Sequence, residues 1–342
     1  MNGGNENDGP VVCWGIIGAG NVAEFKSGPA LMQAPGSTVV AVMRRDAEKA
    51  RDFALRYGVP RWYTDIDALL ADPEVDAVYV ASPHHLHLTH VTRAAQAGKA
   101  ILCEKPVGVS TAEAQAAVDV CRAASVPLSV AYYRRYWPVV QEMRRLLAEG
   151  AIGEVVQARV QLADYFQPDP ERAWLTEPEQ AGGGALANAG SHWIDLIRYL
   201  LGEVVEVTAA CSEHFGGFKT EDTIGVQMRL ASKALVSLNV TLCSPAAVNE
   251  FDIAGTDGRL FAGPLSDGRL MLQRGNREPE ALRFPRSAAA HMELVTEVVR
   301  RLSAGEPSPV PGEEAVAAWQ IMAAAYQSCR ERRHARVIEP SK

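Results

Sequence analysis

Apolar and polar positions follow different patterns in the two parts of the chain, and the first part carries short continuous apolar runs. The run Val11–Ile17 ends in glycines, which is typical of a strand that is buried on both faces. Similar runs predict further strands at Ser37–Met43, Val75–Ala81, Lys99–Cys103 and Pro127–Ala131. Stretches with helical spacing lie between these runs, and strands that alternate with helices predict a parallel sheet with right-handed crossovers.

Local signals mark where some helices of this first part begin and end. Asp46 is placed to cap a helix that carries Phe53 on its apolar face and ends at Gly58. Gly28 and Pro29 interrupt the helix after the first strand, and we expect a break or a kink there. Helical spacing also predicts helices over residues 86–97 and 110–124.

From about Tyr132 onward, the predicted strands alternate apolar with polar residues, as half-exposed antiparallel strands do. These strands are Val155–Leu162, Val205–Cys211, Thr223–Leu230 and Leu235–Leu242. The sequence Gly255-Thr256-Asp257-Gly258 predicts a hairpin turn, and helical spacing returns from about Ala288. The change of pattern predicts a disordered tail at residues 1–10, a first domain at 11–131 and a second domain at 132–342.

Composition narrows the class of protein. The 342 residues are 47% hydrophobic, and 34 basic residues against 41 acidic residues give a formal charge of −7. An acidic balance disfavours a nucleic acid as partner, because phosphate binding needs concentrated basic charge. No apolar stretch approaches the length of a membrane helix, and the polar N-terminus does not resemble a signal peptide. Six scattered cysteines without a CxxC pair indicate a reducing, cytoplasmic location.

The first predicted strand runs directly into Gly18-Ala19-Gly20-Asn21-Val22-Ala23, a GxGxxA sequence that opens a helix. Gly18 permits a tight turn, Gly20 lets backbone N–H groups approach a pyrophosphate, and the small Ala23 allows close packing. Glycine loops also serve as plain connections between a strand and a helix. The position after the first strand of a βαβ pattern favours a dinucleotide site, with Asn21 and Val22 among its contacts.

Arginines occupy the position that selects the cofactor, at the end of the second predicted strand. An acidic residue there would accept hydrogen bonds from the ribose 2′-OH of NAD. Arg44 and Arg45 stand there instead, and a guanidinium suits a 2′-phosphate and can stack on adenine. The alternative is that both arginines are solvated surface charges and that Asp46 is only a helix cap. We therefore expect NADP(H) to be favoured, with NAD(H) as the alternative.

A lysine follows the strand that ends at Cys103. Ligands of open α/β sheets bind outside the carboxyl ends of the strands, so Lys105 is expected to project toward the cofactor. Desolvation beside a nicotinamide would lower the pKa of a lysine toward the range that is useful for proton transfer. The alternative is an ordinary surface lysine in a loop.

The second domain offers a glycine-rich segment, Gly182 to Gly190, that leads into a helical pattern. On one α-helix, a polar stripe would consist of Asn188, His192, Asp195 and Tyr199. The opposite side would be core and consists of Leu186, Trp193, Ile197 and Leu200. A polar stripe is more often a solvated face, and a histidine between apolar neighbours is more often a satisfied core residue.

Four segments together resemble the glucose–fructose oxidoreductase/inositol dehydrogenase family (Gfo/Idh/MocA) in order and spacing over nearly the whole chain. They are Gly15 to Ala23, Ala81-Ser82-Pro83-His84 to His87, Glu104-Lys105-Pro106, and Gly182 to His192. The resemblance implies an α/β protein with an N-terminal Rossmann domain, whose sheet is parallel and doubly wound. It also implies a C-terminal α+β domain with a large, open, mostly antiparallel sheet that commonly forms a homodimer or homotetramer interface.

The resemblance also assigns roles to residues. By position, Lys105 matches the catalytic lysine, and His192 matches the histidine that orients the substrate or relays a proton. Glu104 would orient near the nicotinamide, and relatives tend to have a cis bond before Pro106. The family's usual aspartate, four residues before the histidine, is replaced here by Asn188. An amide can hold a hydroxyl but cannot titrate, which leaves Lys105 as the acid–base group.

Histidines gather after the third predicted strand and superficially suggest a metal site, at His84, His85, His87 and His90. No carboxylate or cysteine joins them, so we expect no metal. The resemblance instead places Ser82, His84 and His87 in a loop beneath the cofactor.

Substrate contacts are expected from four aromatic or basic residues. Tyr133 and Arg134 follow the last strand of the first domain, where relatives place contacting side chains; a charge cluster at a helix start is the alternative. Tyr165 and Trp174 are candidates on loops of the second domain.

The sequence therefore predicts an NAD(P)-dependent oxidoreductase. It would transfer hydride between the nicotinamide and a hydroxyl or keto carbon of a sugar, polyol or related small molecule, with Lys105 as the acid–base group. The alternative is a catalytically inactive NAD(P)-binding sensor or scaffold of the same fold, which only Asn188 suggests.

Overall fold

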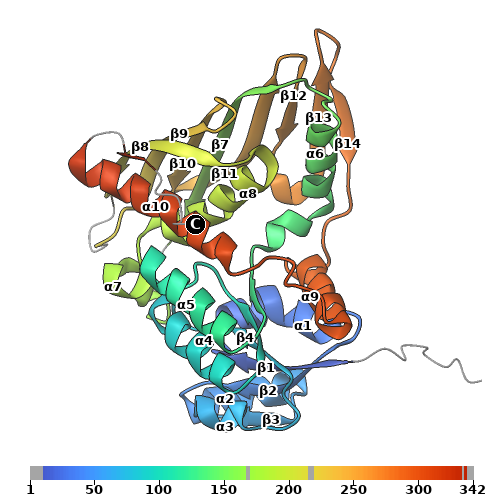
Figure 1. Ribbon diagram of the computed structural model, residues 1–342, viewed down its shortest axis with the longest axis vertical. Helices are drawn as coiled ribbons and strands as arrows, with labels where there is room; N and C mark the ends of the chain where they lie inside the picture. Colours follow the sequence, from blue (N-terminus) through green and yellow to red (C-terminus); the bar gives the residue numbers. More distant parts are fainter. Residues whose placement is uncertain (1–10, 167–169, 215–218, 333–334, 337–342) are drawn as a thin grey trace, which may run out of the picture. The chain divides into compact units, whose positions relative to one another are not determined.

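The computed structural model describes residues 11–166, 170–214, 219–332 and 335–336, so the predicted tail at 1–10 lies outside the described residues (Figure 1). Contacts along the chain divide it into two compact units. The first unit comprises Met1–Gly108, Ala112–Tyr133 and Ser287–Ala315, and the second comprises Val109–Thr111, Arg134–Arg286 and Val316–Lys342. The boundaries of these units differ from those of the predicted domains, because Ser287–Ala315, from the C-terminal part of the chain, belongs to the first unit.

The first unit is built on a six-stranded sheet in the order β3-β2-β1-β4-β5-β6, in which every neighbouring pair is parallel. Its strands are β1 Val12–Ile17, β2 Ser37–Met43, β3 Arg61–Tyr63, β4 Ala77–Val80, β5 Ala100–Cys103 and β6 Leu128–Val130. This order grows outward from β1 in both directions, so the sheet is doubly wound, as predicted. The sequence pattern missed β3, because its three residues form no apolar run.

The central strands explain why the first part of the chain carries continuous apolar runs. Ile16 and Ile17 point to opposite faces of β1, and both are fully buried. Ile16 pairs with Val42 on one side and with Tyr79 on the other. Both faces of the sheet are therefore core, so alternation with polar residues would be costly.

Helices connect these strands. They are α1 Gly28–Gln33, α2 Ala47–Tyr57, α3 Ile66–Leu70, α4 His87–Gln96, α5 Thr111–Ala123 and, from the returning segment, α9 Met292–Ala304. The Asp46 side chain accepts from the Lys49 amide at 3.1 Å and caps α2, which ends at a left-handed Gly58. The expected interruption at Gly28 is also confirmed, because a π-helical turn at Ala23–Ser27 precedes α1.

The second unit contains a nine-stranded sheet in the order β14-β13-β12-β11-β7-β10-β9-β8-β15. Its strands are β7 Val155–Tyr165, β8 Val204–Ser212, β9 Thr223–Leu230, β10 Leu235–Thr241, β11 Cys243–Gly255, β12 Gly258–Ala262, β13 Arg269–Arg274, β14 Glu280–Arg283 and β15 Ala335–Arg336. The expected hairpin joins β11 to β12, with Phe251 opposite Ala262. The sheet is mostly antiparallel, as expected; β7 and β10 pair in parallel with each other, and each also has an antiparallel neighbour.

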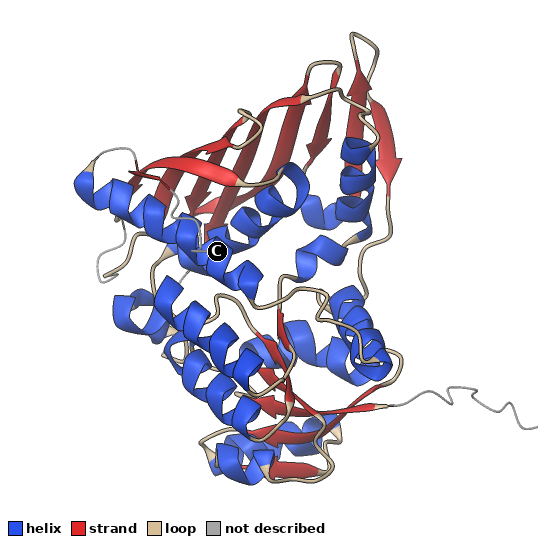
Figure 2. Cartoon of the chain, viewed as in Figure 1, coloured by secondary structure: helices blue, strands red, loops and turns tan. Residues whose placement is uncertain are grey.

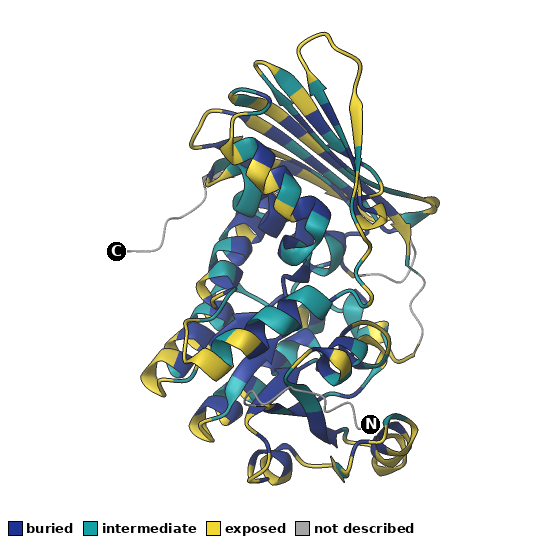
Figure 3. Ribbon diagram, turned by 90° about the vertical axis from the view of Figure 1, so that its right-hand side faces the viewer, coloured by how far each residue is buried: buried dark blue, intermediate teal, exposed yellow. Residues whose placement is uncertain are grey.

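Helices lie on one face of this sheet, whereas its other face carries a mixture of exposed and half-buried residues (Figures 2 and 3). The helices of the second unit are α6 Pro138–Ala148, α7 Pro178–Ala181, α8 Ser191–Leu201 and most of α10 Glu313–Glu331. Strand β9 illustrates the pattern, because Ile224, Val226 and Met228 are buried and alternate with more exposed residues. Within the described residues, no helix is both long and apolar enough to cross a membrane.

Candidate active site

The loop that carries the GxGxxA sequence joins β1 to the first helical turn and lies between the ends of neighbouring strands. The amides of Gly18 and Ala19 both donate to the Met43 carbonyl at the end of β2, at 3.0 and 3.2 Å. Gly18 has φ +90°, and a Cβ there would lie 2.8 Å from the Ser82 amide nitrogen after β4. The conformation and the close packing both require glycine at this position.

Gly20 differs from Gly18, because the protein itself leaves space around it. A Cβ at Gly20 would find only the Gly18 carbonyl oxygen within reach, at 4.0 Å. Asn21 and Val22 follow it and are exposed. A glycine that internal packing does not require fits a loop whose backbone is approached by a ligand such as a dinucleotide pyrophosphate.

The two arginines after β2 have different surroundings. The Arg44 guanidinium donates from Nη1 to the Ala19 carbonyl at 3.2 Å, which places it beside the glycine loop. Arg45 is exposed. Of the two expected cofactor-selecting residues, Arg44 is therefore the one that the structure places at the loop.

The histidines after β4 make specific contacts with the protein. The His87 ring is fully buried, with Nδ1 2.8 Å from the Pro106 carbonyl oxygen and Nε2 2.7 Å from that of Ser82. The Ser82 hydroxyl lies 2.9 Å from His90 Nδ1, and His84 is buried. In the described parts of the chain, no group of three or more potential ligand residues could hold a metal ion. His87 thus ties the loop after β4 to the segment after β5.

Glu104 and Lys105 follow β5 directly. The Glu104 amide donates to the Val80 carbonyl at 2.9 Å, which extends the ladder between β4 and β5 by one residue. Lys105 is half-buried, and the peptide bond between it and Pro106 is cis, as the resemblance implied. This places the lysine at the carboxyl edge of the sheet, where Gly18 and Ser82 also lie.

The Glu104 carboxylate is buried within a cluster that the sequence did not indicate. Its Oε1 accepts from the Tyr79 hydroxyl at 2.5 Å and lies 3.0 Å from His291 Nε2. We call Tyr79, Glu104 and His291 the Glu104 cluster. Burial would raise the pKa of Glu104, but the hydrogen bond and attraction of His291, the charge of Lys105 and the Tyr79 hydroxyl lower it to about 2.

In the second unit, a buried glutamate holds the glycine-rich segment. Glu221 accepts from the Gly184 and Leu186 amides at 2.8 and 2.9 Å, and from the Tyr326 hydroxyl at 2.9 Å. The Ala187 amide also donates to the Tyr326 oxygen, at 3.3 Å. We call Gly184, Leu186, Glu221 and Tyr326 the Glu221 cluster. It fixes the backbone immediately before Asn188, and the sequence did not reveal it.

The helix that carries Asn188 and His192 differs from the single α-helix that was predicted. A π-helical turn covers Leu186–Gly190, and α8 begins only at Ser191. The wider turn takes Asn188 out of the α-helical spacing on which the predicted stripe relied.

The other residues of the predicted stripe, His192, Asp195 and Tyr199, are buried or are bonded to neighbouring side chains. Asp195 is buried and forms an ion pair with two nitrogens of the buried Arg135, at 2.5 to 3.0 Å. The Tyr199 hydroxyl accepts from Gln141 and Arg144. His192 is 6% exposed. The predicted core is confirmed for Leu186, Trp193 and Ile197, which are fully buried, whereas Leu200 is half-buried.

The four predicted substrate residues lie in different environments. Tyr133 is buried, and its ring centroid is 4.1 Å from that of His291. The Arg134 guanidinium lies 5.1 Å from the Trp193 ring centroid and 5.8 Å from that of Trp137, which is a favourable cation–π arrangement. Two other candidates are more accessible: Tyr165 is exposed and Trp174 is half-buried.

Comparison with known proteins agrees with this geometry. Residues 12–132 match the oxidoreductase family with an NAD-binding Rossmann fold, and residues 140–261 match the GFO/IDH/MocA C-terminal domain. An aldose–aldose oxidoreductase from Caulobacter crescentus, solved in complex with glycerol, superposes with a TM-score of 0.87 at 26% identity. The superposition covers 95% of this chain and 99% of that one.

Curated relatives point to the same family. Oxidoreductase P35 of Formosa agariphila is 40% identical over 206 residues, which span 59% of this chain and 64% of the relative. A 1,5-anhydro-D-fructose reductase of Ensifer adhaerens is 33% identical over 251 residues, which span 72% of this chain and 74% of the relative. The chain thus belongs to the GFO/IDH/MocA family of oxidoreductases, with an NAD-binding Rossmann fold in its first unit.

Proposed function

We propose that the protein is an NADP(H)-dependent oxidoreductase that interconverts a hydroxyl and a keto carbon of a sugar or polyol, with Lys105 as the acid–base group. One observation carries the proposal: Lys105 stands on the same sheet edge as the glycine loop. The Ala81 amide donates to the Ile17 carbonyl at 2.9 Å, and the Glu104 amide donates to the Val80 carbonyl at 2.9 Å. These bonds align the ends of β1, β4 and β5, and ligands of such sheets bind outside this edge.

Each residue has a defined task in this proposal. A bound nicotinamide dinucleotide supplies the hydride acceptor or donor. Lys105 gives a proton to the developing alkoxide when a carbonyl is reduced, and takes the hydroxyl proton in the reverse direction. Asn188 and His192 hold substrate hydroxyls. The cofactor is held by Gly18, Gly20, Asn21, Val22, Arg44, Arg45, Ser82, His84, His87, Glu104 and Lys105.

The substrate class rests on the relatives. The name of the Ensifer relative specifies reduction of an anhydro sugar, and the solved Caulobacter relative is named for aldoses. Both names describe chemistry at a carbon that carries a hydroxyl or carbonyl oxygen. Tyr133, Arg134, Tyr165 and Trp174 remain our candidates for substrate contacts, and the stacked guanidinium of Arg134 supports its inclusion.

The central test is the variant Lys105→Met, which keeps a long side chain but cannot exchange a proton. Turnover should be measured with 1,5-anhydro-D-fructose plus NADPH, and with glucose plus NADP+. Because general acid–base catalysis contributes about 10²- to 10⁴-fold, we expect a loss of at least about 100-fold. Cofactor affinity, followed by nicotinamide fluorescence, should stay within about threefold of that of the unaltered protein, because Lys105 is only one of the eleven residues proposed to hold the cofactor.

Two outcomes separate the proposal from its alternative. A Lys105→Met variant that retains most of its activity would exclude the lysine as the acid–base group. Absence of turnover in the unaltered protein, across a panel of sugars, polyols and keto-sugars with both cofactors, would instead favour an inactive NAD(P)-binding sensor or scaffold.

The preference for NADP(H) rests on Arg44, and Arg45 supplies a matched control. We expect NADPH to bind at least about tenfold more tightly than NADH, which requires only about 1.4 kcal/mol. Arg44→Gln should remove most of this preference, because that guanidinium lies beside the glycine loop. Arg45→Gln should have a smaller effect, because Arg45 is exposed. Equal affinity of the unaltered protein for NADH would refute the cofactor assignment.

We also propose that the protein forms a homodimer or homotetramer through the second unit's sheet. Among the described residues, one face of this sheet carries no helices, and Leu235, which alternates along β10 with the buried Val236 and Leu238, lies on that face and is 54% accessible. Light scattering coupled to size exclusion would measure the mass, and a monomer at micromolar concentration would contradict the proposal.

A cytoplasmic location is part of the proposal. All six cysteines are free thiols in the structure, and thiols persist in reducing compartments.

A further inference from the structure

His291 is buried beside the candidate catalytic segment, although it lies far away in the sequence. It directly precedes α9, and its ring is 1% exposed. Its Nε2 lies 3.0 Å from Oε1 of Glu104, which is 187 positions earlier in the chain. The contact lies within the first unit, because the segment Ser287–Ala315 belongs to that unit.

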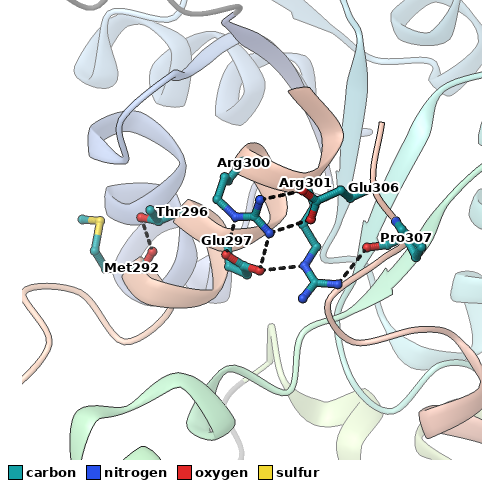
Figure 4. A network of polar contacts seen from close by, with 7 residues as sticks. All are labelled: Met292, Thr296, Glu297, Arg300, Arg301, Glu306 and Pro307. Atoms are coloured by element: carbon teal, nitrogen blue, oxygen red, sulfur yellow. Dashed lines mark hydrogen bonds and ion pairs between the residues drawn. The ribbon is translucent and has the colours of Figure 1, made fainter. Parts of the chain in front are cut away.

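Several contacts fix the segment that carries this histidine. Helix α9 packs against α1 and β1. Figure 4 shows how its C-terminal half is held: Glu297 bonds both Arg300 and Arg301, Arg300 also bonds Glu306, and Arg301 reaches the Pro307 carbonyl. Beyond this network, the Val130 amide of β6 donates to the Val310 carbonyl at 2.9 Å. The segment is therefore anchored to the sheet that carries Lys105.

The charge of the carboxylate determines which partner donates the hydrogen bond between His291 and Glu104. An ionised carboxylate can only accept, so His291 must carry a hydrogen on Nε2 and donate it to Glu104. Among the described residues, Nδ1 of His291 has no hydrogen-bond partner. The Tyr133 ring packs against the imidazole, with 4.1 Å between centroids and a tilt of 35° between the ring planes. Packing thus holds the ring, and its polar contact is directed at the carboxylate.

Glu104 also interacts with Lys105, the next residue in the chain. Its Oε2 accepts from the Lys105 amide at 3.2 Å, and the charge of Lys105 contributes to the low pKa of Glu104. Electrostatic coupling is mutual, so an ionised Glu104 must also favour the protonated form of Lys105.

Few other groups near Glu104 can change their charge around neutral pH. The groups that face it are Tyr79 on β4, Cys103 on β5, His87 on α4, Lys105 and His291. Burial and the nearby Glu104 charge raise the pKa values of Tyr79 and Cys103, and burial lowers that of His87. These three are neutral at pH 7, so Glu104 and His291 are the groups of this buried set whose charge can act on the neighbouring Lys105.

We propose that His291 is a positioning residue for Lys105: its hydrogen bond keeps Glu104 ionised and in place, and Glu104 in turn sets the proton affinity of the lysine. The catalytic meaning of this arrangement rests on the proposed function, in which Lys105 exchanges the proton. The arrangement itself can be tested without any substrate.

The test measures how readily Lys105 loses its proton. Only a neutral amine reacts with acetic anhydride, so the pH midpoint of labelling, quantified by mass spectrometry of the peptide containing Lys105, reports its protonation. His291→Phe keeps a ring against Tyr133 but removes the donor, and burial then favours protonation of Glu104. We expect the midpoint to fall by about one pH unit, because the negative charge beside the lysine is lost. His291→Gln can still donate and should stay close to the unaltered protein.

Further variants separate positioning from simple loss of stability. Glu104→Gln removes the charge directly and should lower the midpoint as well, and His291→Phe combined with Glu104→Gln should lower it no further. Glu297→Gln breaks the network in Figure 4 on the same helix and should leave the midpoint unchanged. If the larger phenylalanine prevents folding, His291→Ala removes the same donor without overpacking.

The outcomes distinguish this inference from the proposed function. An unchanged labelling midpoint in a folded His291→Phe or His291→Ala variant would overturn the positioning role. Retention of activity by Lys105→Met would overturn the acid–base role of the lysine, and it would leave the labelling result intact.

Discussion

Among the described residues, each unit of the protein buries one glutamate in or beside a segment that carries candidate catalytic residues, and the two glutamates are held in different ways. Glu104 and Glu221 are both 8% exposed, and each accepts a hydrogen bond from a tyrosine hydroxyl. Glu104 has two potentially cationic neighbours, Lys105 and His291. The other donors to Glu221 are neutral backbone amides.

This difference reverses the direction of the pKa shift. Burial raises the pKa of Glu221, and the hydrogen bonds from Leu186, Gly184 and Tyr326 offset only part of that effect. For Glu104 the same penalty is overcome by His291, Lys105 and the tyrosine, and the pKa falls to about 2. Neutral donors can satisfy a buried carboxylate, but here only the carboxylate that also has charged neighbours has a lowered pKa.

The comparison suggests two kinds of support. The Glu104 cluster supplies a fixed negative charge next to the proposed acid–base lysine. In the Glu221 cluster the donors are neutral, burial raises the pKa of the carboxyl, and the hydrogen bonds hold the backbone that precedes Asn188. The variants below would break one cluster at a time, so that the electrostatic and the mechanical contributions can be told apart.

The largest effect is expected where the Glu221 cluster has no room to adjust. In Gly184→Ala, the new Cβ would lie 1.8 Å from the Glu221 carbonyl oxygen, so the backbone must move. We expect the free energy of unfolding to fall by about 3 kcal/mol or more, as overpacking of rigid surroundings does. Urea denaturation followed by circular dichroism would measure the loss.

Gly20→Ala is the matched control for this variant, because its Cβ would meet only the Gly18 oxygen at 4.0 Å. Its unfolding free energy should change by less than about 1 kcal/mol, while affinity for NADPH should fall, because the methyl group occupies space proposed for the pyrophosphate. Equal destabilisation by the two alanines would refute the distinction between a structural and a ligand-binding glycine.

Much of the first unit could be predicted from the sequence, because its strands, helix cap and glycine loop are each encoded by residues that are close together in the chain. The sequence pattern predicted the strand Ser37–Met43, the cap at Asp46 and the glycine loop. Each of these features depends on residues that are close together in the chain. The buried faces of a parallel sheet also leave an unbroken apolar run, which few other structures produce.

The two glutamate clusters could not be predicted in this way. His291 is 187 positions from Glu104, and Tyr326 is 105 positions from Glu221, so no spacing relates them. The π-helical turn around Asn188 was also missed, because Leu186–Gly190 has a sequence that an α-helix would accept. The backbone beside this turn is bonded to Glu221 and Tyr326, which are far away in the sequence, so these hydrogen bonds form only when the chain is folded.

An intermediate effect is expected when each carboxylate is replaced by an amide. The pKa of Glu104 is lowered from 4.5 to about 2, so its charge stabilises the fold above its ordinary pKa, and this contribution is lost as the pH falls through that interval. Glu104→Gln should therefore cost about 2 kcal/mol at neutral pH and progressively less in acid.

Glu221→Gln should show the opposite slope. Because the pKa of Glu221 is raised, its carboxyl stabilises the fold when protonated, and this contribution is lost as the pH rises through the folded value. The amide should thus cost more near pH 4 than at neutral pH. Urea unfolding of both variants and the unaltered protein, between about pH 4 and pH 8, would measure the two slopes. Slopes of the same sign would mean that the clusters do not differ in charge.

The smallest effects are expected from removing one hydroxyl from each cluster, and they probe the same difference. Tyr79→Phe deletes a donor to an ionised carboxylate, which should cost about 1.5 kcal/mol or more, since hydrogen bonds to charged groups are the stronger kind. Tyr326→Phe deletes a donor to Glu221, whose pKa is raised, together with the acceptor of the longer 3.3 Å bond from the Ala187 amide, and should cost about 1 kcal/mol. Both phenylalanines fill nearly the same volume as the tyrosines they replace, so packing is matched. A larger loss of stability in Tyr326→Phe than in Tyr79→Phe at neutral pH would contradict this prediction. The Tyr79 hydroxyl would then stabilise the fold no more than a neutral hydrogen bond does, and the ionic character assigned to the Glu104 cluster would be wrong.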